Sequence, residues 1–261
     1  MTARADQTGE RWLIAILFGL AGVAWFVTRQ LATPDMEVGP LTQRHDVAMS
    51  SMHDGASMQA GLFLVTWVVM MAAMMLPAIW PVLLIVRRWA RRRGTWLPVA
   101  SFVTGYLVVW TAAGAGAFGL LLVFESTHLV NSSSAVRLGG ALVLGVGLYQ
   151  LSPLKAVCLR HCRSPRAFLA KHTDRLTRSA LGIVRTGATH GLYCLGCCWA
   201  LMVLLLMVGM MSLAWMAGIA GLIFAEKVLP RGPLIGRVVA VLLVAAGIIV
   251  GATGVGFVAP A

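Results

Sequence analysis

The sequence predicts an all-α protein, one polytopic bundle of about seven transmembrane helices that fills residues 1–261. Of the 261 residues, 59% are hydrophobic and only 11% are charged, a composition that a soluble domain of this size would not have. Apolar stretches recur along the whole chain, each close to the roughly 20 residues that a helix needs to cross hydrocarbon. Basic residues gather in alternate connections between these stretches, as expected for a chain that crosses a membrane repeatedly.

Each predicted span is an apolar run with polar or charged residues at its ends. The second run contains Pro77 and Pro81, which remove backbone hydrogen bonds and predict a kink. Glycine and alanine at 112–119 and 139–147 predict close helix packing in the third and fourth runs. The seven runs are Trp12–Leu31, Leu62–Val86, Leu97–Phe124, Ala135–Leu151, His190–Met210, Leu213–Val228 (the shortest) and Gly236–Val258.

The distribution of basic residues predicts the orientation. Of the 21 Lys and Arg residues, all except Arg29, Arg44 and Arg137 fall on one side of the predicted membrane. The positive-inside rule then places the N-terminus in the cytoplasm and the C-terminus outside. The first run is too long for a signal-peptide core and is predicted to be an uncleaved span. We therefore expect the net charge of +12 to favour anionic lipid, with no role in binding nucleic acid.

Two longer connections are predicted. The outer loop, 33–60, carries His45, Met49, Met52, His53 and Met58, which are typical copper ligands outside the cytoplasm and predict a capture segment. The cytoplasmic basic loop, 152–189, carries apolar residues among its arginines and predicts an amphipathic helix at the lipid interface. Those apolar residues are Phe168, Leu169, Leu176 and Leu181.

All five cysteines lie in two short clusters, each beside a histidine. His190, Cys194 and Cys197 are spaced i, i+4, i+7, and Cys198 follows Cys194 by four, so one helical face presents these groups at the predicted cytoplasmic mouth of the fifth span. The second cluster, Cys158, His161 and Cys162, has the spacing i, i+3, i+4. Thiolate and imidazole bind Cu(I) and Zn(II), so the two clusters together predict a metal site. The alternative is that the cysteines only fill space between helices.

Methionines in the second and fifth runs form a second pattern. Met70 and Met74, and likewise Met71 and Met75, are four residues apart beside Pro77, and Met202 follows Cys198 by four residues. Thioethers bind Cu(I) without adding charge, so they suit a site inside hydrocarbon. The alternative is that methionine fills irregular gaps between helices.

No catalytic residue set is predicted, because the chain has neither a glycine-rich phosphate loop nor a Ser/His/Asp arrangement. Glu226 lies beside Lys227 at the end of the sixth run; it could be a ligand, a proton acceptor or an interfacial charge paired with the arginine-rich loops, and the last role is favoured. The motifs Met70-Met71-x-Ala73-Met74-Met75-x-Pro77, Cys158-Leu159-x-x-Cys162-Arg163 and Cys194-Leu195-Gly196-Cys197-Cys198 resemble the bacterial family of predicted metal-binding integral membrane proteins. The resemblance implies a metal-binding protein of the inner membrane and supplies no reaction.

The sequence favours a protein that binds Cu(I), with Zn(II) as the alternative metal, and that transports the metal or supplies it to a copper enzyme. The partners expected are a metal ion, membrane lipid, and a metallochaperone or copper enzyme. A second reading is a thiol-disulfide carrier in which Cys194 and Cys197 exchange electrons. A third is a structural adaptor, for which replacing all five cysteines would leave function intact.

Overall fold

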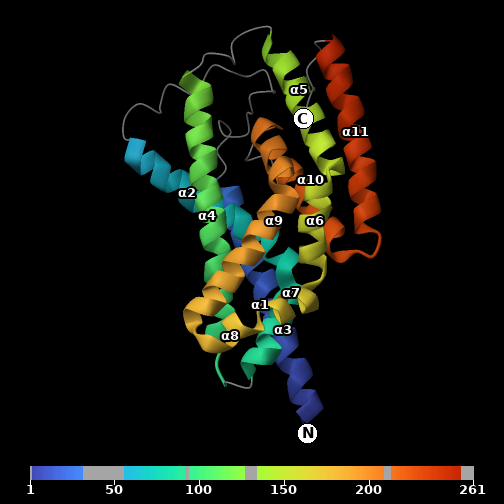
Figure 1. Ribbon diagram of the computed structural model, residues 1–261. Coiled ribbons are helices and arrows are strands. Elements are labelled where there is room, and N and C mark those ends of the chain that lie inside the picture. Colours follow the sequence, from blue (N-terminus) through green and yellow to red (C-terminus); the bar gives the residue numbers. More distant parts are fainter. Residues whose placement is uncertain (1, 32–55, 92–93, 127–133, 209–212, 254–261) are drawn as a thin grey trace.

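The computed structural model describes residues 2–31, 56–91, 94–126, 134–208 and 213–253, which are almost entirely helical and contain no strand (Figure 1). The predicted all-α class is confirmed. The elements are α1 (Thr2–Leu31), α2 (Ala56–Met75), a 3-10 turn (Pro77–Ile79), α3 (Trp80–Arg91), α4 (Leu97–Ser126), α5 (Ser134–Leu151), α6 (Pro153–Arg163), α7 (Pro165–Lys171), α8 (Thr173–Arg178), α9 (Ala180–Val208), α10 (Leu213–Val228) and α11 (Gly232–Thr253).

Several of these helices are long and apolar enough to cross a membrane. Within the described residues there are four such spans, Glu10–Gln30, Leu97–Val123, Ala180–Leu206 and Gly232–Thr253. The number rises to six if each of two bent pairs is one span: Ala60–Met75 with Pro77–Ala90, bent by 44°, and Arg137–Leu151 with Pro153–Arg163, bent by 57°. The predicted run Leu213–Val228 is α10, whose 16 residues are short for a crossing. The seventh span and the orientation of the termini stay predictions.

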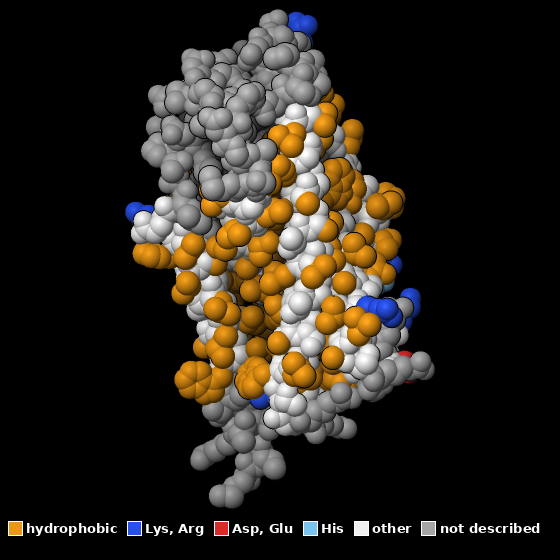
Figure 2. Space-filling model, turned by 90° about the vertical axis from the view of Figure 1, so that its left-hand side faces the viewer, with side chains coloured by type: hydrophobic (Ala, Val, Ile, Leu, Met, Phe, Trp, Pro, Cys, Tyr) orange, Lys and Arg blue, Asp and Glu red, His pale blue; other side chains and the backbone are white. Residues whose placement is uncertain are grey.

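The outer surface fits a membrane environment. Figure 2 shows a face whose described part is mainly hydrophobic, with Lys and Arg at its margins. Large apolar side chains such as Trp12, Phe26, Val108 and Leu242 are exposed. Apolar surface of this extent would be costly in water and is neutral in hydrocarbon. Several helices are therefore placed to face lipid.

Helix α9 lies at the centre of the bundle and contacts α4, α5, α6, α8 and α10 (Figure 1). It is the most enclosed candidate span, with 56% of its most apolar window buried, against 22–28% for the other three. The sequence interpretation started this span at His190. The helix begins ten residues earlier, at Ala180, because the Ser179 hydroxyl accepts a hydrogen bond from the Gly182 amide and caps the first turn. Cys194 therefore lies midway along α9, not at its mouth.

The segment predicted as the basic loop is folded into the bundle. It forms α6, α7, α8 and the first part of α9. We expected Phe168, Leu169, Leu176 and Leu181 to face lipid, but the first three are buried in the protein core, and of these four Leu181 alone is exposed. The core beneath these short helices offers them a protein surface, so burial there replaces contact with lipid.

Close packing of α4 on α9 depends on glycine. A Cβ atom at Gly187 would collide with the backbone carbonyl of Phe102, and one at Gly105 would collide with that of Val184. Small residues let two helix backbones approach in this way. The close approach brings the aromatic residues of α4 against the cysteine face of α9.

Candidate metal centre

The two cysteine clusters meet where α6 packs on α9. Helix α6 starts sharply because the Ser152 hydroxyl accepts a hydrogen bond from the Lys155 amide and Pro153 occupies its first turn. The chain bends by 57° between α5 and α6, and α6 packs on α9. Cys158 then lies against Gly196, where a Cβ atom would be only 2.7 Å from the Cys158 sulfur. The glycine inside the Cys-x-x-Cys-Cys sequence is thus needed for the approach of the second cluster.

The thiols of the two clusters touch. The sulfur atoms of Cys162 and Cys197 are 3.9 Å apart, and all five cysteines are free thiols. Cys197 and Cys198 donate hydrogen bonds from their thiols to the Cys194 carbonyl, at 3.1 Å and 2.9 Å. Cys197 also interacts electrostatically with the thiols of Cys162, Cys194 and Cys198. We call Cys162, Cys194, Cys197 and Cys198 the sulfur cluster.

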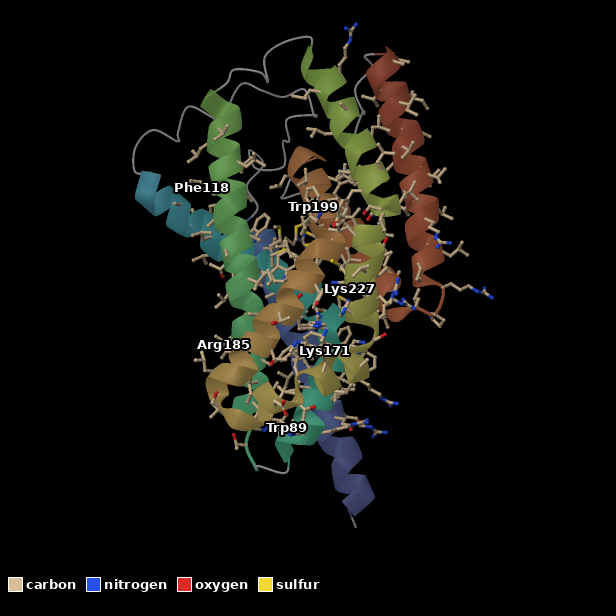
Figure 3. The ribbon with its side chains drawn as sticks, viewed as in Figure 1. Trp89, Phe118, Lys171, Arg185, Trp199 and Lys227 are labelled. Carbon is tan, nitrogen blue, oxygen red and sulfur yellow. The ribbon has the colours of Figure 1, made fainter. Side chains whose placement is uncertain are left out.

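Cys194 has two further polar neighbours. Its sulfur is 3.0 Å from the Tyr106 hydroxyl of α4 and 2.9 Å from the Lys227 ammonium of α10. The same ammonium is 4.0 Å from the thioether sulfur of Met75. Figure 3 shows Lys227 in the interior of the bundle, near the sulfur atoms. Helices α4 and α10 therefore meet α9 at Cys194, and the end of α2 reaches the same place through the contact of Met75 with Lys227.

A buried ion pair adjoins the sulfur cluster. The Lys155 ammonium donates to both carboxylate oxygens of Glu226, at 2.8 Å each, and to the Gln150 side-chain oxygen. Arg163 donates to the carbonyls of Glu226 and Leu229 and so fixes the last turn of α10. In this turn, Glu226 points toward Lys155, and Lys227, the next residue in the sequence, points toward Cys194.

The prediction that Glu226 is an interfacial charge was wrong, because its exposed fraction is only 2% and that of its neighbour Lys227 is 7%, although its partner Lys155 does come from the predicted basic loop. Charged residues at the end of a short apolar run do suit an interface, but here α6 and α9 cover that end. Lys155 and Tyr106 were not predicted as site residues. Lys155 could have been found, because it follows an apolar run directly and an ionisable residue in a membrane segment suggests a functional site.

The two predicted histidine ligands pack against aromatic rings. His190 is 1% exposed and packs among the rings of Phe102, Tyr106 and Phe168. Its Nδ1 atom is buried and has no hydrogen-bond partner within the part of the chain that the structure describes, which is unusual for a polar atom in a folded protein. His161 stacks on Tyr193 with ring centroids 4.2 Å apart, and its Nδ1 atom lies 2.9 Å from the Val157 carbonyl oxygen.

The predicted methionine ligands are core residues. Met70, Met71, Met74, Met75 and Met202 are each at most 4% exposed. Of these, Met75 reaches the polar groups beside the sulfur cluster through Lys227. The predicted capture segment falls almost wholly outside the described residues, including His45, Met49, Met52 and His53.

The thiols of the sulfur cluster are suitable ligands for a soft metal, but they are not arranged as a tetrahedral site. In the part of the chain that the structure describes, no three His, Cys, Asp or Glu side chains converge as ligands on one point. Structural Zn(II) sites take four such ligands in a tetrahedron. The thiols that do meet form a pair, which is sufficient for a metal that accepts two sulfur ligands.

A family model for the PpoB2 copper chaperones matches residues 64–250. This match extends from α2 into α11 and includes every cysteine, Lys155, Glu226 and Lys227. The chain belongs to the PpoB2 copper chaperone family. Membership indicates a copper-related function, and the resemblance to a metal-binding membrane family agrees with it. No curated protein and no solved structure matches the chain.

Proposed function

We propose that this PpoB2-family protein binds Cu(I) through the thiolates of Cys162 and Cys197 and holds it for a copper-requiring partner. The observation that carries the proposal is the 3.9 Å contact between these two sulfur atoms, which joins the cysteine clusters of α6 and α9. Thiolates are preferred ligands of Cu(I), and two of them suffice for this ion. Zn(II) is disfavoured because no larger ligand group converges among the described residues.

The position of the sulfur cluster supports a role within the membrane. It lies midway along α9, the most enclosed candidate span. In the proposed route, copper passes from the His and Met residues of 33–60 to the buried methionines of α2 and then to the sulfur cluster, by exchange of one ligand for the next. The receiving partner is a metallochaperone or copper enzyme of a bacterial inner membrane, and the chain crosses that membrane seven times with its N-terminus inside.

Copper content of the purified protein tests the proposed site. Full-length protein is purified in detergent without oxygen, loaded with Cu(I), freed of excess metal and analysed by mass spectrometry. We expect close to one copper per wild-type chain and a large loss in Cys162→Ser and Cys197→Ser. Cys158→Ser is the matched control, since the Cys158 sulfur lies against Gly196 and is not one of the two proposed ligands, and it should retain most of its copper. Equal copper in the wild type and in the double variant C162S/C197S would refute the site.

The same thiol pair also favours the second candidate function, a thiol-disulfide carrier. Oxidation of Cys162 and Cys197 to a disulfide would release two protons and pass two electrons to a partner disulfide, which would be reduced to a dithiol. The copper proposal takes precedence because of the family. The carrier would be favoured instead if the wild-type protein held no copper while its thiols titrated reversibly against a glutathione redox buffer.

A further inference from the structure

Lys227 is a buried ammonium group among sulfur atoms. Its exposed fraction is 7%, and its Nζ atom contacts the Cys194 thiol at 2.9 Å and the Met75 thioether at 4.0 Å. Lysine is almost never buried unless it is paired, because an uncompensated charge in a protein interior is costly. The copper family membership does not explain why a cation should occupy the sulfur cluster.

Among the described residues, no salt bridge joins Lys227 to a carboxylate. The nearest candidate is its neighbour Glu226, but both carboxylate oxygens of Glu226 accept hydrogen bonds from Lys155. Arg163 approaches the same turn through backbone carbonyl groups. The charges of Lys155 and Glu226 therefore cancel, and Lys227 leaves one positive charge in excess beside the thiols.

A Cu(I) complex with two thiolates has the charge that would balance this excess. Binding of Cu(I) by two thiols releases both protons to the solvent, and the complex of one monovalent cation with two thiolates carries one negative charge. The geometry points to Lys227 as the counter-ion of the bound copper, a role that rests on the proposed function and makes Lys227 a determinant of metal selectivity. With Lys227 in place, the buried centre that contains Cu(I) is neutral.

The arrangement of the helices supports this role. Lys227 interacts electrostatically with the thiols of Cys194, Cys197 and Cys198. Its helix, α10, contributes no thiol to the sulfur cluster, so Lys227 adds charge without adding a ligand. Arg163 and the Lys155–Glu226 pair hold the turn that directs it. A fixed positive charge in a water-poor interior acts much more strongly than one in solvent.

Selectivity follows from the same charge count. A divalent cation bound by two thiolates forms a neutral complex, which leaves the charge of Lys227 uncompensated. Lys227 thus favours Cu(I) and Ag(I) over Zn(II). Removal of the charge should reverse this preference, because the neutral divalent complex then has no cation beside it.

The test compares Lys227→Leu with Lys227→Arg in full-length protein in detergent. Leucine removes the charge without adding a soft ligand, and arginine keeps the charge. Affinities for Cu(I), Ag(I) and Zn(II) are measured by competition with a chelator in the absence of oxygen. We expect Lys227→Leu to lose about 100-fold in affinity for both monovalent ions, as for one partner of a buried charge pair. Its Zn(II) affinity should hold or rise, and Lys227→Arg should stay within about tenfold of the wild type.

Circular dichroism and gel filtration identify any variant that fails to fold. If Lys227→Leu does not fold, the folded Lys227→Gln variant, which also lacks the charge, is measured instead. A neutral variant that binds Cu(I) and Ag(I) as tightly as the wild type would overturn the counter-ion role while leaving the copper site intact. A wild-type protein that binds no Cu(I) would instead overturn the proposed function, so the two failures are distinguishable.

Discussion

Two pairs of helices in this protein pack through glycine but enclose very different chemistry. In the α5–α11 pair, a Cβ atom at Gly247 would collide with the backbone of Leu144, and one at Gly147 would collide with Val244. In the α4–α9 pair, Gly105 and Gly187 play the same part. Close packing by small residues is therefore common to both and indicates architecture rather than function.

The difference lies in the residues beside each contact. The α4–α9 contact carries Tyr106, His190 and Cys194, all at most 1% exposed. The α5–α11 contact carries aliphatic side chains and glycine, and α11 has only 22% of its window buried. Polar and ionisable groups inside a membrane domain are costly. Through Cys194, the α4–α9 contact adjoins the sulfur cluster, whereas the α5–α11 contact does not contain any of its thiols.

The largest effect on stability is expected where a charge is left without its partner. In Lys155→Leu, Glu226 would remain buried with no cation bound to its carboxylate, and we expect a loss of about 3–5 kcal/mol in the free energy of unfolding. Unfolding in detergent, followed by circular dichroism, measures the change.

The double variant Lys155→Leu with Glu226→Leu is the control for this charge effect. It removes both charges and should recover most of the lost stability, because an apolar pair can replace a buried ion pair. If the single and double variants were equally unstable, packing of the Lys155 side chain would matter more for stability than its charge. Buried charge would then not distinguish the interior around α9 from the apolar α5–α11 contact.

The second prediction compares the two glycine contacts directly. Gly187→Ala and Gly247→Ala each place a methyl group against the backbone of a neighbouring helix, and each should cost about 1–3 kcal/mol of stability. Gly187 lies opposite Phe102, one turn from Tyr106, so its replacement should also lower Cu(I) affinity, by about tenfold. Gly247→Ala should leave Cu(I) affinity unchanged in the folded protein.

Thermal unfolding and Cu(I) competition on the same two preparations separate these effects. We expect Gly187→Ala and Gly247→Ala to lower the free energy of unfolding equally, and only Gly187→Ala to lower Cu(I) affinity. Similar losses of Cu(I) affinity in both variants would mean that the α5–α11 pair also controls the sulfur cluster, and that the two contacts are not functionally distinct.

Several features of the fold and of the sulfur cluster could be predicted from the sequence. Composition gave the all-α membrane class, and helical spacing placed Cys194, Cys197 and Cys198 on one helix. The kink at Pro77 followed from the missing backbone hydrogen bond, and the helix axis does bend by 44° there. These are local properties, which follow from the residue types and their spacing.

The parts that the sequence did not predict depend on contacts between distant segments. The pairing of Lys155 with Glu226 joins residues 71 positions apart, and that of Lys227 with Cys194 joins residues 33 apart. The start of α9 at Ala180 was missed because its first turns contain polar residues, which hydropathy assigns to a loop. Burial of Phe168 and Leu169 could not be distinguished from contact with lipid, since both environments accept apolar side chains.

The smallest predicted effect concerns a single hydroxyl group beside the sulfur cluster. Tyr106→Phe removes the contact of 3.0 Å with the Cys194 sulfur and keeps the ring, so we expect a loss of about 1 kcal/mol in stability and of about fivefold in Cu(I) affinity. Tyr149→Phe is the matched control, because the Tyr149 hydroxyl donates to the Gly196 backbone carbonyl of α9 and not to a cysteine sulfur. It should lower stability to a similar extent and leave Cu(I) affinity unchanged. If both variants lowered Cu(I) affinity equally, the contribution of Tyr106 would lie in anchoring α9 rather than in its contact with Cys194.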